Sequence, residues 1–231
     1  MTKKMSSHFD KNLLINNFNR AAGQYEDYAL IQKKIGDDLF ERLKYIKLDP
    51  KSIVDLGCGT GLYTRQLADL YPQATITGID FSSQMIAQAI EKSDLHQGLI
   101  FHCEEATSTQ LPDHSVDLIF SNLLFHWCDT ASLLKECCRL LKPNGLLLFA
   151  ALGPDTLYEL RQSWKKIDNF VHVNSFTDMH HVGDALLKQG FKDPVTDLEY
   201  VTTTFPDLFS LMSSLKAIGV QNANLKRSPG L

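Results

Sequence analysis

The sequence predicts an α/β fold built on a doubly wound, mostly parallel sheet. Three observations support this prediction. Between residues 52 and 152, short apolar runs alternate with amphipathic stretches, the pattern of parallel strands covered by helices on both faces. A turn with glycines at 57, 59 and 61 follows the first apolar run. The chain has 231 residues, of which 44% are hydrophobic and 22% charged, so it can bury the core of one large domain.

The expected elements follow in order along the chain. Apolar side chains recur every three or four residues over 25–48, which predicts one amphipathic helix. The strands expected in the sheet are 52–56, 75–79, 99–103, 116–120 and 146–152. The helices between them are 61–70, 82–91 and one that begins at Asp129 or Thr130 and is stopped by 142–145. Beyond Gly153 we expect helices over 156–166, 178–189 and 207–218, and a strand over 194–204.

Composition narrows the classes of function. A net charge of −4 and a pI of about 6.0 offer no basic excess for a nucleic acid backbone. The five cysteines lack both CxxC spacing and Cys/His ligand spacing, so neither a disulfide framework nor a metal site is expected. The N-terminus lacks the apolar region of a signal peptide, and no apolar run is long enough to span a bilayer. We therefore expect a cytoplasmic protein in a reducing compartment.

The glycine-rich turn indicates a nucleotide-like cofactor. Gly57, Cys58, Gly59 and Gly61 form a turn in which the backbone can approach a ligand closely, because glycine has no Cβ to collide with it. A dinucleotide site is the competing interpretation, but it usually has the spacing G-x-G-x-x-G. Here the spacing is G-x-G-x-G, and Asp55 precedes it. A carboxylate at that position would repel a diphosphate and suits a cationic amino group, which predicts S-adenosylmethionine.

Residues at the ends of the next two strands are expected to bind the rest of this cofactor. Asp80 ends the second strand, where its two oxygens can accept hydrogen bonds from both ribose hydroxyls. After the third strand, Glu104 or Glu105 offers a carboxylate for the adenine amine and Ala106 offers a backbone N–H. Counting back from Leu111 favours Glu105. A solvated acidic loop is the alternative.

The segment after the fourth strand should reach the same edge of the sheet. Asn122 is expected to line the floor of the site near the methyl donor. His126 and Trp127 follow it. These two side chains either face the substrate or pack against their neighbours in a hydrogen-bonded core.

Several longer motifs carry a resemblance to a known family. They are Phe18-Asn-Arg-Ala-Ala22 with Tyr25, Ala29 and Gln32; Gly153-Pro-Asp-Thr-Leu-Tyr-Glu-Leu-Arg161 with Trp164; His172-Val-Asn-Ser-Phe-Thr-Asp-Met-His180 with Val182-Gly-Asp-Ala-Leu186; and Leu215-Lys-Ala-Ile-Gly219 with Asn222-Ala223. With these motifs the chain resembles, over nearly its whole length, the malonyl-[acyl-carrier-protein] O-methyltransferases of biotin synthesis. These are Rossmann-like class I methyltransferases that use S-adenosylmethionine.

The resemblance implies transfer of a methyl group to the free carboxylate of malonyl-acyl-carrier protein. The ester would mask that charge and allow the primer to enter an apolar elongation pocket on the route to pimeloyl groups. A carboxylate is already ionised at pH 7, so the reaction needs no general base. The carboxylate does need a positive partner when it enters an apolar cleft. Arg161 is the first candidate, and Arg20 is the second.

The resemblance also predicts how the single domain is organised. Residues 1–48 form a helical segment that closes over the site with Tyr25, residues 49–152 form the cofactor core, and residues 153–231 supply substrate-side helices and a C-terminal strand. Arg161, Tyr25 and His126 are the predicted catalytic residues. An acidic carrier protein should dock on a locally basic surface, for which the available cations are Lys165, Lys166, Lys188, Lys216, Lys226 and Arg227.

One departure and two alternatives accompany this reading. Family members continue beyond the equivalent of 229–231 with a helix and a final antiparallel strand beside the fifth strand. We therefore expect that strand to be missing, and the exposed edge to favour dimers or edge-to-edge association. A similar core and the stretch around 211–223 also resemble a respiratory complex I assembly factor associated with arginine hydroxylation. A methyltransferase that acts on another small carboxylic acid is the third reading.

Overall fold

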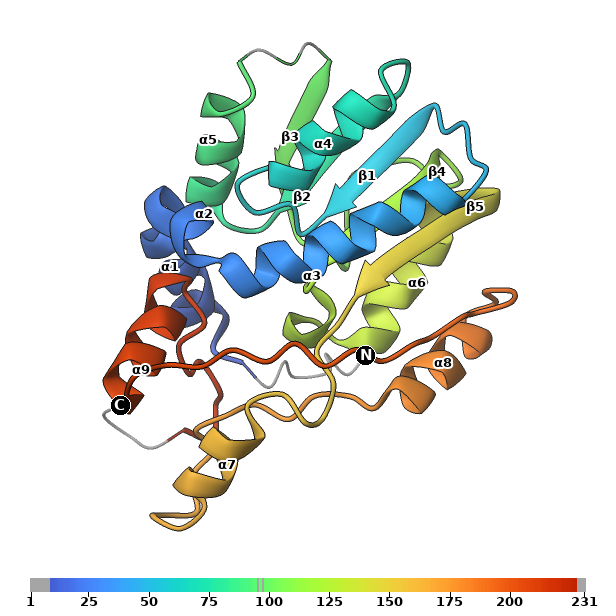
Figure 1. Ribbon diagram of the computed structural model, residues 1–231. Helices are drawn as coiled ribbons and strands as arrows, with labels where there is room; N and C mark the ends of the chain where they lie inside the picture. Colours follow the sequence, from blue (N-terminus) through green and yellow to red (C-terminus); the bar gives the residue numbers. More distant parts are fainter. Residues whose placement is uncertain (1–8, 95, 97, 228–231) are drawn as a thin grey trace, which may run out of the picture.

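The centre of the protein is a five-stranded sheet in the order β3-β2-β1-β4-β5 (Figure 1). The computed structural model describes residues 9–94, 96 and 98–227. All four neighbouring pairs of strands are parallel. The strands are β1 (Ser52–Leu56), β2 (Thr75–Asp80), β3 (Leu99–Cys103), β4 (Val116–Asn122) and β5 (Leu141–Ala150). The predicted doubly wound α/β fold is confirmed.

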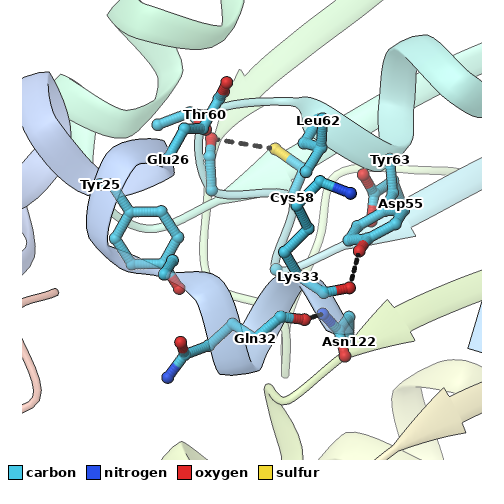
Figure 2. Close-up of a pocket in the computed structure, with 13 residues that line it drawn as sticks. Tyr25, Glu26, Gln32, Lys33, Asp55, Cys58, Thr60, Leu62, Tyr63 and Asn122 are labelled. Atoms are coloured by element: carbon cyan, nitrogen blue, oxygen red, sulfur yellow. Dashed lines mark hydrogen bonds between the residues drawn. The ribbon is translucent and has the colours of Figure 1, made fainter. Parts of the chain in front are cut away.

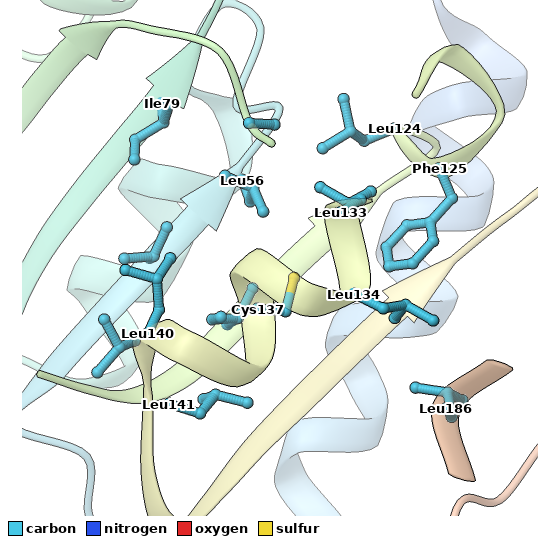
Figure 3. Close-up of a cluster of buried hydrophobic side chains, with 14 of the residues drawn as sticks. Leu56, Ile79, Leu124, Phe125, Leu133, Leu134, Cys137, Leu140, Leu141 and Leu186 are labelled. Carbon is cyan, nitrogen blue, oxygen red and sulfur yellow. The ribbon is translucent and has the colours of Figure 1, made fainter. Parts of the chain in front are cut away.

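Helices cover both faces of the sheet because successive strand residues point to opposite sides. Ile53 and Phe120 pack with α3 (Leu30–Glu41) and α4 (Leu62–Leu70) on one face. Val54 and Leu56 pack on the other face with α6 (Thr130–Leu140) and α8 (Met179–Lys188), as the buried cluster in Figure 3 shows. Three further helices are α5 (Ser83–Glu91), α7 (Tyr158–Trp164) and α9 (Leu208–Ala217).

Aspartate and serine caps place the starts of several helices. Ser82 accepts a hydrogen bond from the Met85 N–H at the start of α5, and Asp129 caps α6 in the same way. Asp178 caps α8 and Asp207 caps α9. Each cap satisfies an N–H that has no partner within its helix. The starts of these four helices were therefore predictable to within a residue or two.

The N-terminal segment differs from the single helix predicted over 25–48. The structure has α1 (Lys11–Ala21), a 3₁₀ turn (Ala22–Gln24), α2 (Tyr25–Tyr28), α3 and a second 3₁₀ turn (Arg42–Tyr45). The break lies at Ala29, whose ψ of 43° is not helical and whose side chain is 4% exposed. Alanine favours helices, so the residue at this position does not by itself account for the break. Helix α1 precedes the predicted helix and lies in the segment 1–48, which was expected to be helical without bounds for this helix.

The strand predicted over 194–204 is wrong. These residues are non-helical coil that pairs with no strand in the described part of the chain. Val195 is 93% exposed and Tyr200 71% exposed. Their β-branched and aromatic composition favours extended backbone, but a strand also needs a neighbouring ladder of hydrogen bonds. Conversely, β5 begins five residues earlier than expected and includes 142–145, with an irregular register opposite Val116 and Leu118.

Candidate active site

The carboxyl ends of β1, β2 and β4 meet at the glycine-rich turn. Its glycines all have positive φ, with values of 80°, 54° and 76° at Gly57, Gly59 and Gly61. Side chains are strained in this backbone region, whereas glycine is not. The N–H groups of Gly57 and Cys58 donate to the Ile79 carbonyl at 2.8 and 3.0 Å. The turn is therefore held against the end of β2, beside Asp80.

Asp80 anchors the turn from the second strand. One carboxylate oxygen accepts the Gly59 N–H at 3.0 Å, and the other accepts the Ser82 N–H at 2.8 Å. Burial raises the pKa of Asp80 to about 6, although both hydrogen bonds oppose the rise and the charge of Glu105 adds to it. Each oxygen retains a further lone pair. Asp80 can therefore accept ligand hydroxyls while it keeps the turn in place.

Asp55 lies beneath the turn in a small pocket shared with Tyr25 and Asn122 (Figure 2). Its side chain is buried, and one oxygen accepts the hydroxyl of Thr64 at 2.6 Å. Burial raises the pKa of Asp55 to about 7; the Thr64 hydrogen bond opposes this rise and the charge of Asp80 adds to it. No cation is among the groups that act on either carboxylate within the described residues. Two neighbouring buried acids of this kind suit a cationic ligand.

The N-terminal segment lies over the turn through Glu26 of α2. One oxygen of Glu26 accepts the Thr60 hydroxyl at 2.6 Å and lies 3.2 Å from nitrogens of Arg65 and Lys92. These three partners come from the turn, from α4 and from the C-cap of α5. Although burial alone would raise the pKa of Glu26, these partners hold it below its usual value. Tyr25, the preceding residue, lines the site, and burial together with the charge of Asp80 raises its pKa far above the usual range.

Asn122 joins the end of β4 to this segment. Its side-chain amide donates to the Gln32 carbonyl at 2.9 Å. Its Oδ1 atom is buried and has no partner within the described residues. A buried acceptor without a donor is costly. The ligand pocket therefore contains a free acceptor that a ligand N–H can satisfy.

A larger cavity of about 620 Å³ extends from the turn to α7 and α9. Gly57, Asp80 and Asn122 line its cofactor end. Its walls are mostly apolar, and they include Phe81, Met85, Leu152, Leu160, Phe176 and Met212. This size suits a small-molecule site. Helices α7 and α9 lie beyond the carboxyl edge of the sheet (Figure 1), so this cavity joins the cofactor turn to the segments that carry the family-specific motifs.

His126 lines this cavity as a packed, neutral side chain. Its ring centroid lies 4.9 Å from that of Trp127 and 5.6 Å from that of Phe176. Burial lowers its pKa to about 3, so at neutral pH the ring is uncharged, with one N–H and no second proton to act as a general acid. Its Nδ1 atom is buried without a partner among the described residues. The geometry favours the packed alternative, while contact with substrate stays a prediction.

Arg161 lies behind the cavity wall. Its guanidinium donates to the backbone carbonyls of Pro154 at 2.7 Å, Thr156 at 2.8 Å and Asn174 at 3.2 Å. It also lies 5.9 Å from the centroid of the Phe176 ring. Thr156, Asn174 and Phe176 line the cavity, whereas Arg161 does not. Arg161 therefore holds the wall together, and its direct contact with substrate stays a prediction.

The residues predicted at the adenine end are not among the described residues that line the cavity. Glu105 forms an ion pair with Lys11 at 2.7 Å, and Glu104 accepts the Gln110 N–H at 2.9 Å. Neither Glu105 nor Ala106 lines the cavity, and Ala106 packs in the core. The side chain of Cys58 lines the small pocket, where burial raises its pKa well above the usual value.

Several residues that line the cavity were not assigned to the cofactor site from the sequence, and four of them bear on the argument. Phe81 and Met85 follow Asp80, and Phe18 packs edge-on between Phe81 and Trp127 with centroid distances of 5.7 and 5.6 Å. The position of Phe81 directly after the acid of the second strand was a usable signal. Phe18 was visible only as part of a motif. Lys216, also on the wall, was assigned only to the docking surface.

Known proteins match both the fold and the full sequence. Residues 54–149 match the model of the methyltransferase domain family. A protein from Legionella pneumophila named malonyl-[acyl-carrier protein] O-methyltransferase is 40% identical over 215 residues, which cover 93% of this chain and 76% of that protein. A protein from Coxiella burnetii, named malonyl-[acyl-carrier protein] O-methyltransferase 1, is 41% identical over 229 residues, which cover 99% of this chain and 78% of that protein.

Solved structures agree on the fold. A SAM-dependent methyltransferase from Aquifex aeolicus superposes with a TM-score of 0.53 at 22% identity, covering 69% of this chain and 86% of that one. An N-methyltransferase 2 from Haemonchus contortus, in complex with phosphomonomethylethanolamine and S-adenosylhomocysteine, gives a TM-score of 0.57 at 21% identity, with 68% and 37% covered. The class I methyltransferase fold predicted from the sequence is confirmed. At this level of identity to curated relatives over nearly the whole chain, the protein belongs to the malonyl-[acyl-carrier protein] O-methyltransferase family.

Proposed function

We propose that this protein transfers the methyl group of S-adenosylmethionine to the free carboxylate of malonyl-acyl-carrier protein. The names of the curated relatives support the acceptor. The observation that carries the cofactor is the pair of buried carboxylates, Asp55 and Asp80, which have raised pKa values and no cationic partner among the described residues. A ligand with an ammonium group, ribose hydroxyls and no phosphate matches both acids. The malonyl methyl ester would prime pimeloyl synthesis for biotin.

Each part of the cofactor has a candidate partner. Asp55 and the unpartnered Oδ1 of Asn122, which line the same pocket, would accept its ammonium group. Asp80 would accept the ribose hydroxyls with its remaining lone pairs. Phe81 and Met85 offer apolar surface for the adenine ring. The glycine turn would contact the cofactor through its backbone.

The reaction needs positioning more than acid–base chemistry. When bound, S-adenosylmethionine supplies a methyl group activated by a sulfonium. The acceptor carboxylate is ionised at pH 7, so one oxygen can form the new O–C bond as the S–C bond breaks, giving a methyl ester and a neutral thioether. His126 need not move a proton in this scheme. The protein would contribute in-line placement of the two reactants and exclusion of water.

The N-terminal segment supports this role as a cover of the site. Tyr25 faces both the turn and the larger cavity, and Glu26 ties α2 to the turn through Thr60. We propose that residues 9–48 cover the cofactor and that residues 153–227 form the acceptor side. Arg161 would act here as a positioning residue, because it binds carbonyls in two segments that contribute Thr156 and Asn174 to the cavity wall.

A transfer assay with labelled cofactor tests the proposal. Malonyl-acyl-carrier protein, malonyl coenzyme A and free malonate are offered in parallel, and the labelled methyl ester is measured. We expect transfer to the malonyl thioesters, with the carrier protein preferred. Absence of transfer to all three would contradict the proposed function. Label on a different carboxylic acid would support the broader methyltransferase reading instead, and the comparisons do not favour the reading as an assembly factor with arginine hydroxylase activity.

A further inference from the structure

The larger cavity of about 620 Å³, here called the acceptor cavity, has a single positively charged side chain among the described residues that line it. The only ionisable groups on its wall besides the two histidines and Tyr25 are Asp80 and Lys216. A malonyl carboxylate that enters an apolar cavity beside a buried aspartate meets repulsion and needs a compensating cation. Arg161 does not line the cavity; its two terminal nitrogens donate to backbone carbonyls, and only its buried Nε has no partner among the described residues. Lys216 is therefore the cation that faces the proposed substrate.

The fold fixes the backbone of Lys216 beside the cofactor cover. Gly219, just after α9, has a φ of 79°, and a Cβ there would lie 3.0 Å from the Asn17 carbonyl oxygen. The Gln24 side chain donates to the Ala217 carbonyl at 3.4 Å. Ile218 is 3% exposed. The end of α9 is thus docked on the segment that carries Tyr25, and Figure 1 shows α9 beside α1 and α2.

The side chain of Lys216, in contrast, has no polar partner among the described residues. Lys216 is exposed, and its ammonium has no hydrogen bond or ion pair to any other described residue. Most other lysines near the site are engaged: Lys33 pairs with Asp37 at 2.6 Å, and Lys92 pairs with Glu26 at 3.2 Å. A flexible lysine can hold one oxygen of a carboxylate as a point charge. This leaves the second oxygen free to attack the methyl group.

We propose that Lys216 binds the malonyl carboxylate and orients it toward the methyl donor. The identity of the acceptor in this assignment rests on the proposed function. The choice of Lys216 rests on the lining of the cavity and on the docked end of α9. It makes the stretch Leu215–Gly219 a substrate-binding element of the cavity as well as part of a surface for the carrier.

The test compares Lys216→Met with Lys135→Met. Both lysines are exposed helical residues whose ammonium groups have no hydrogen bond or ion pair to another described residue, so each variant removes one solvated charge. Lys135 does not line the cavity and is not among the cations of the expected docking surface. For Lys216→Met we expect the KM for malonyl-acyl-carrier protein to rise about tenfold or more, while Lys135→Met stays near wild type. Lys216→Arg should recover part of the loss, and thermal melts confirm that each variant is folded.

Two further measurements separate the malonyl carboxylate from other anions. The affinity for S-adenosylhomocysteine should be unchanged in Lys216→Met; a loss matching the rise in KM would assign the lysine to the cofactor's own carboxylate and overturn the proposal. Malonyl-N-acetylcysteamine lacks the phosphate and the carrier, so the same fold-loss is expected with it. A loss seen only with the carrier substrate would assign Lys216 to the arm phosphate or to docking, which also overturns the proposal.

Binding without turnover distinguishes failure of this inference from failure of the proposed function. Calorimetry of malonyl-N-acetylcysteamine with the S-adenosylhomocysteine complex should show weaker binding for Lys216→Met than for wild type. If wild type transfers no methyl group yet this difference is found, the proposed reaction fails and the carboxylate site stands. If wild type is active and both variants match it in KM and binding, the site fails and the reaction stands.

Discussion

The cofactor half (residues 49–152) and the acceptor half (residues 153–227) are held together in different ways. In the cofactor half, five parallel strands carry the ligand-facing residues, and side chains such as Asp80 bind backbone N–H groups of neighbouring loops. In the acceptor half, the described residues form three helices and contribute no strand to the sheet. Phe209 is 83% exposed there, and Val195 is 93% exposed.

One arginine in each half illustrates how differently the two halves are held together. Arg139 in the cofactor half pairs with Glu136 and Asp113, both at 2.6 Å. Arg161 in the acceptor half binds three backbone carbonyls and has no carboxylate partner within the described part of the chain. The cofactor site is therefore built into the sheet, whereas the acceptor wall depends on a few side-chain contacts. Substitutions in the two halves should affect different ligands.

The largest expected effect is a loss of cofactor affinity when Asp80 is substituted. In Asp80→Asn an amide NH₂ would face a backbone N–H, so either Gly59 or Ser82 loses its acceptor. We expect the dissociation constant for S-adenosylhomocysteine to rise about 100-fold in titration calorimetry. Asp117→Asn is the matched control, because Asp117 accepts the N–H groups of Lys51 and Ser52 at the opposite end of the sheet. It should lower stability and leave the affinity unchanged; equal losses in both variants would contradict the assignment.

The second effect separates the two arginines. Arg161→Ala should reduce methyl transfer to malonyl-acyl-carrier protein about tenfold, because the cavity wall loses the contacts that fix Thr156 and Asn174. Its affinity for S-adenosylhomocysteine should stay near wild type. Arg139→Ala should instead lower the melting temperature, since Glu136 loses a close ion-pair partner. Unchanged turnover in Arg161→Ala would remove this residue from the acceptor site.

A third prediction uses the pH dependence of Asp55. Its folded-state pKa of about 7 lies above the ordinary value of 3.8, so the folded protein binds this proton more tightly than the unfolded chain does. The stability from this group is complete below about pH 4 and is lost as the pH rises through 7. Asp55→Asn stays neutral, so without cofactor it should gain stability relative to wild type between pH 5 and pH 8, by on the order of 2 kcal/mol.

Urea unfolding of both proteins at the two pH values measures this difference. The same variant should bind S-adenosylhomocysteine more weakly, because it lacks the charge that faces the ammonium group. A variant that becomes less stable than wild type as the pH rises would contradict the assigned direction.

The smallest effect concerns the edge of the sheet. Strand β5 pairs with β4 and with no second strand in the described part of the chain. Unpaired edges favour association with another copy, so we expect weak dimers in sedimentation velocity experiments at high protein concentration. A monomer across the accessible concentration range would contradict this prediction.

The sequence by itself determined the sheet and the cofactor turn. Buried parallel strands and their covering helices leave local patterns of apolar residues, and the glycine spacing with Asp55 and Asp80 reports backbone geometry and charge within one segment. The family also followed from the sequence, since its motifs extend over both halves.

Only the tertiary structure decided the details that depend on distant partners. The break at Ala29 follows α2, which contacts the turn through Glu26, and 194–204 stays coil because no strand is available beside it. Glu105 forms an ion pair with Lys11, and Arg161 donates hydrogen bonds to backbone carbonyls, while Lys216 lines the cavity. A charged side chain reaches several partners from one backbone position, so its partner is set by packing that no local pattern records.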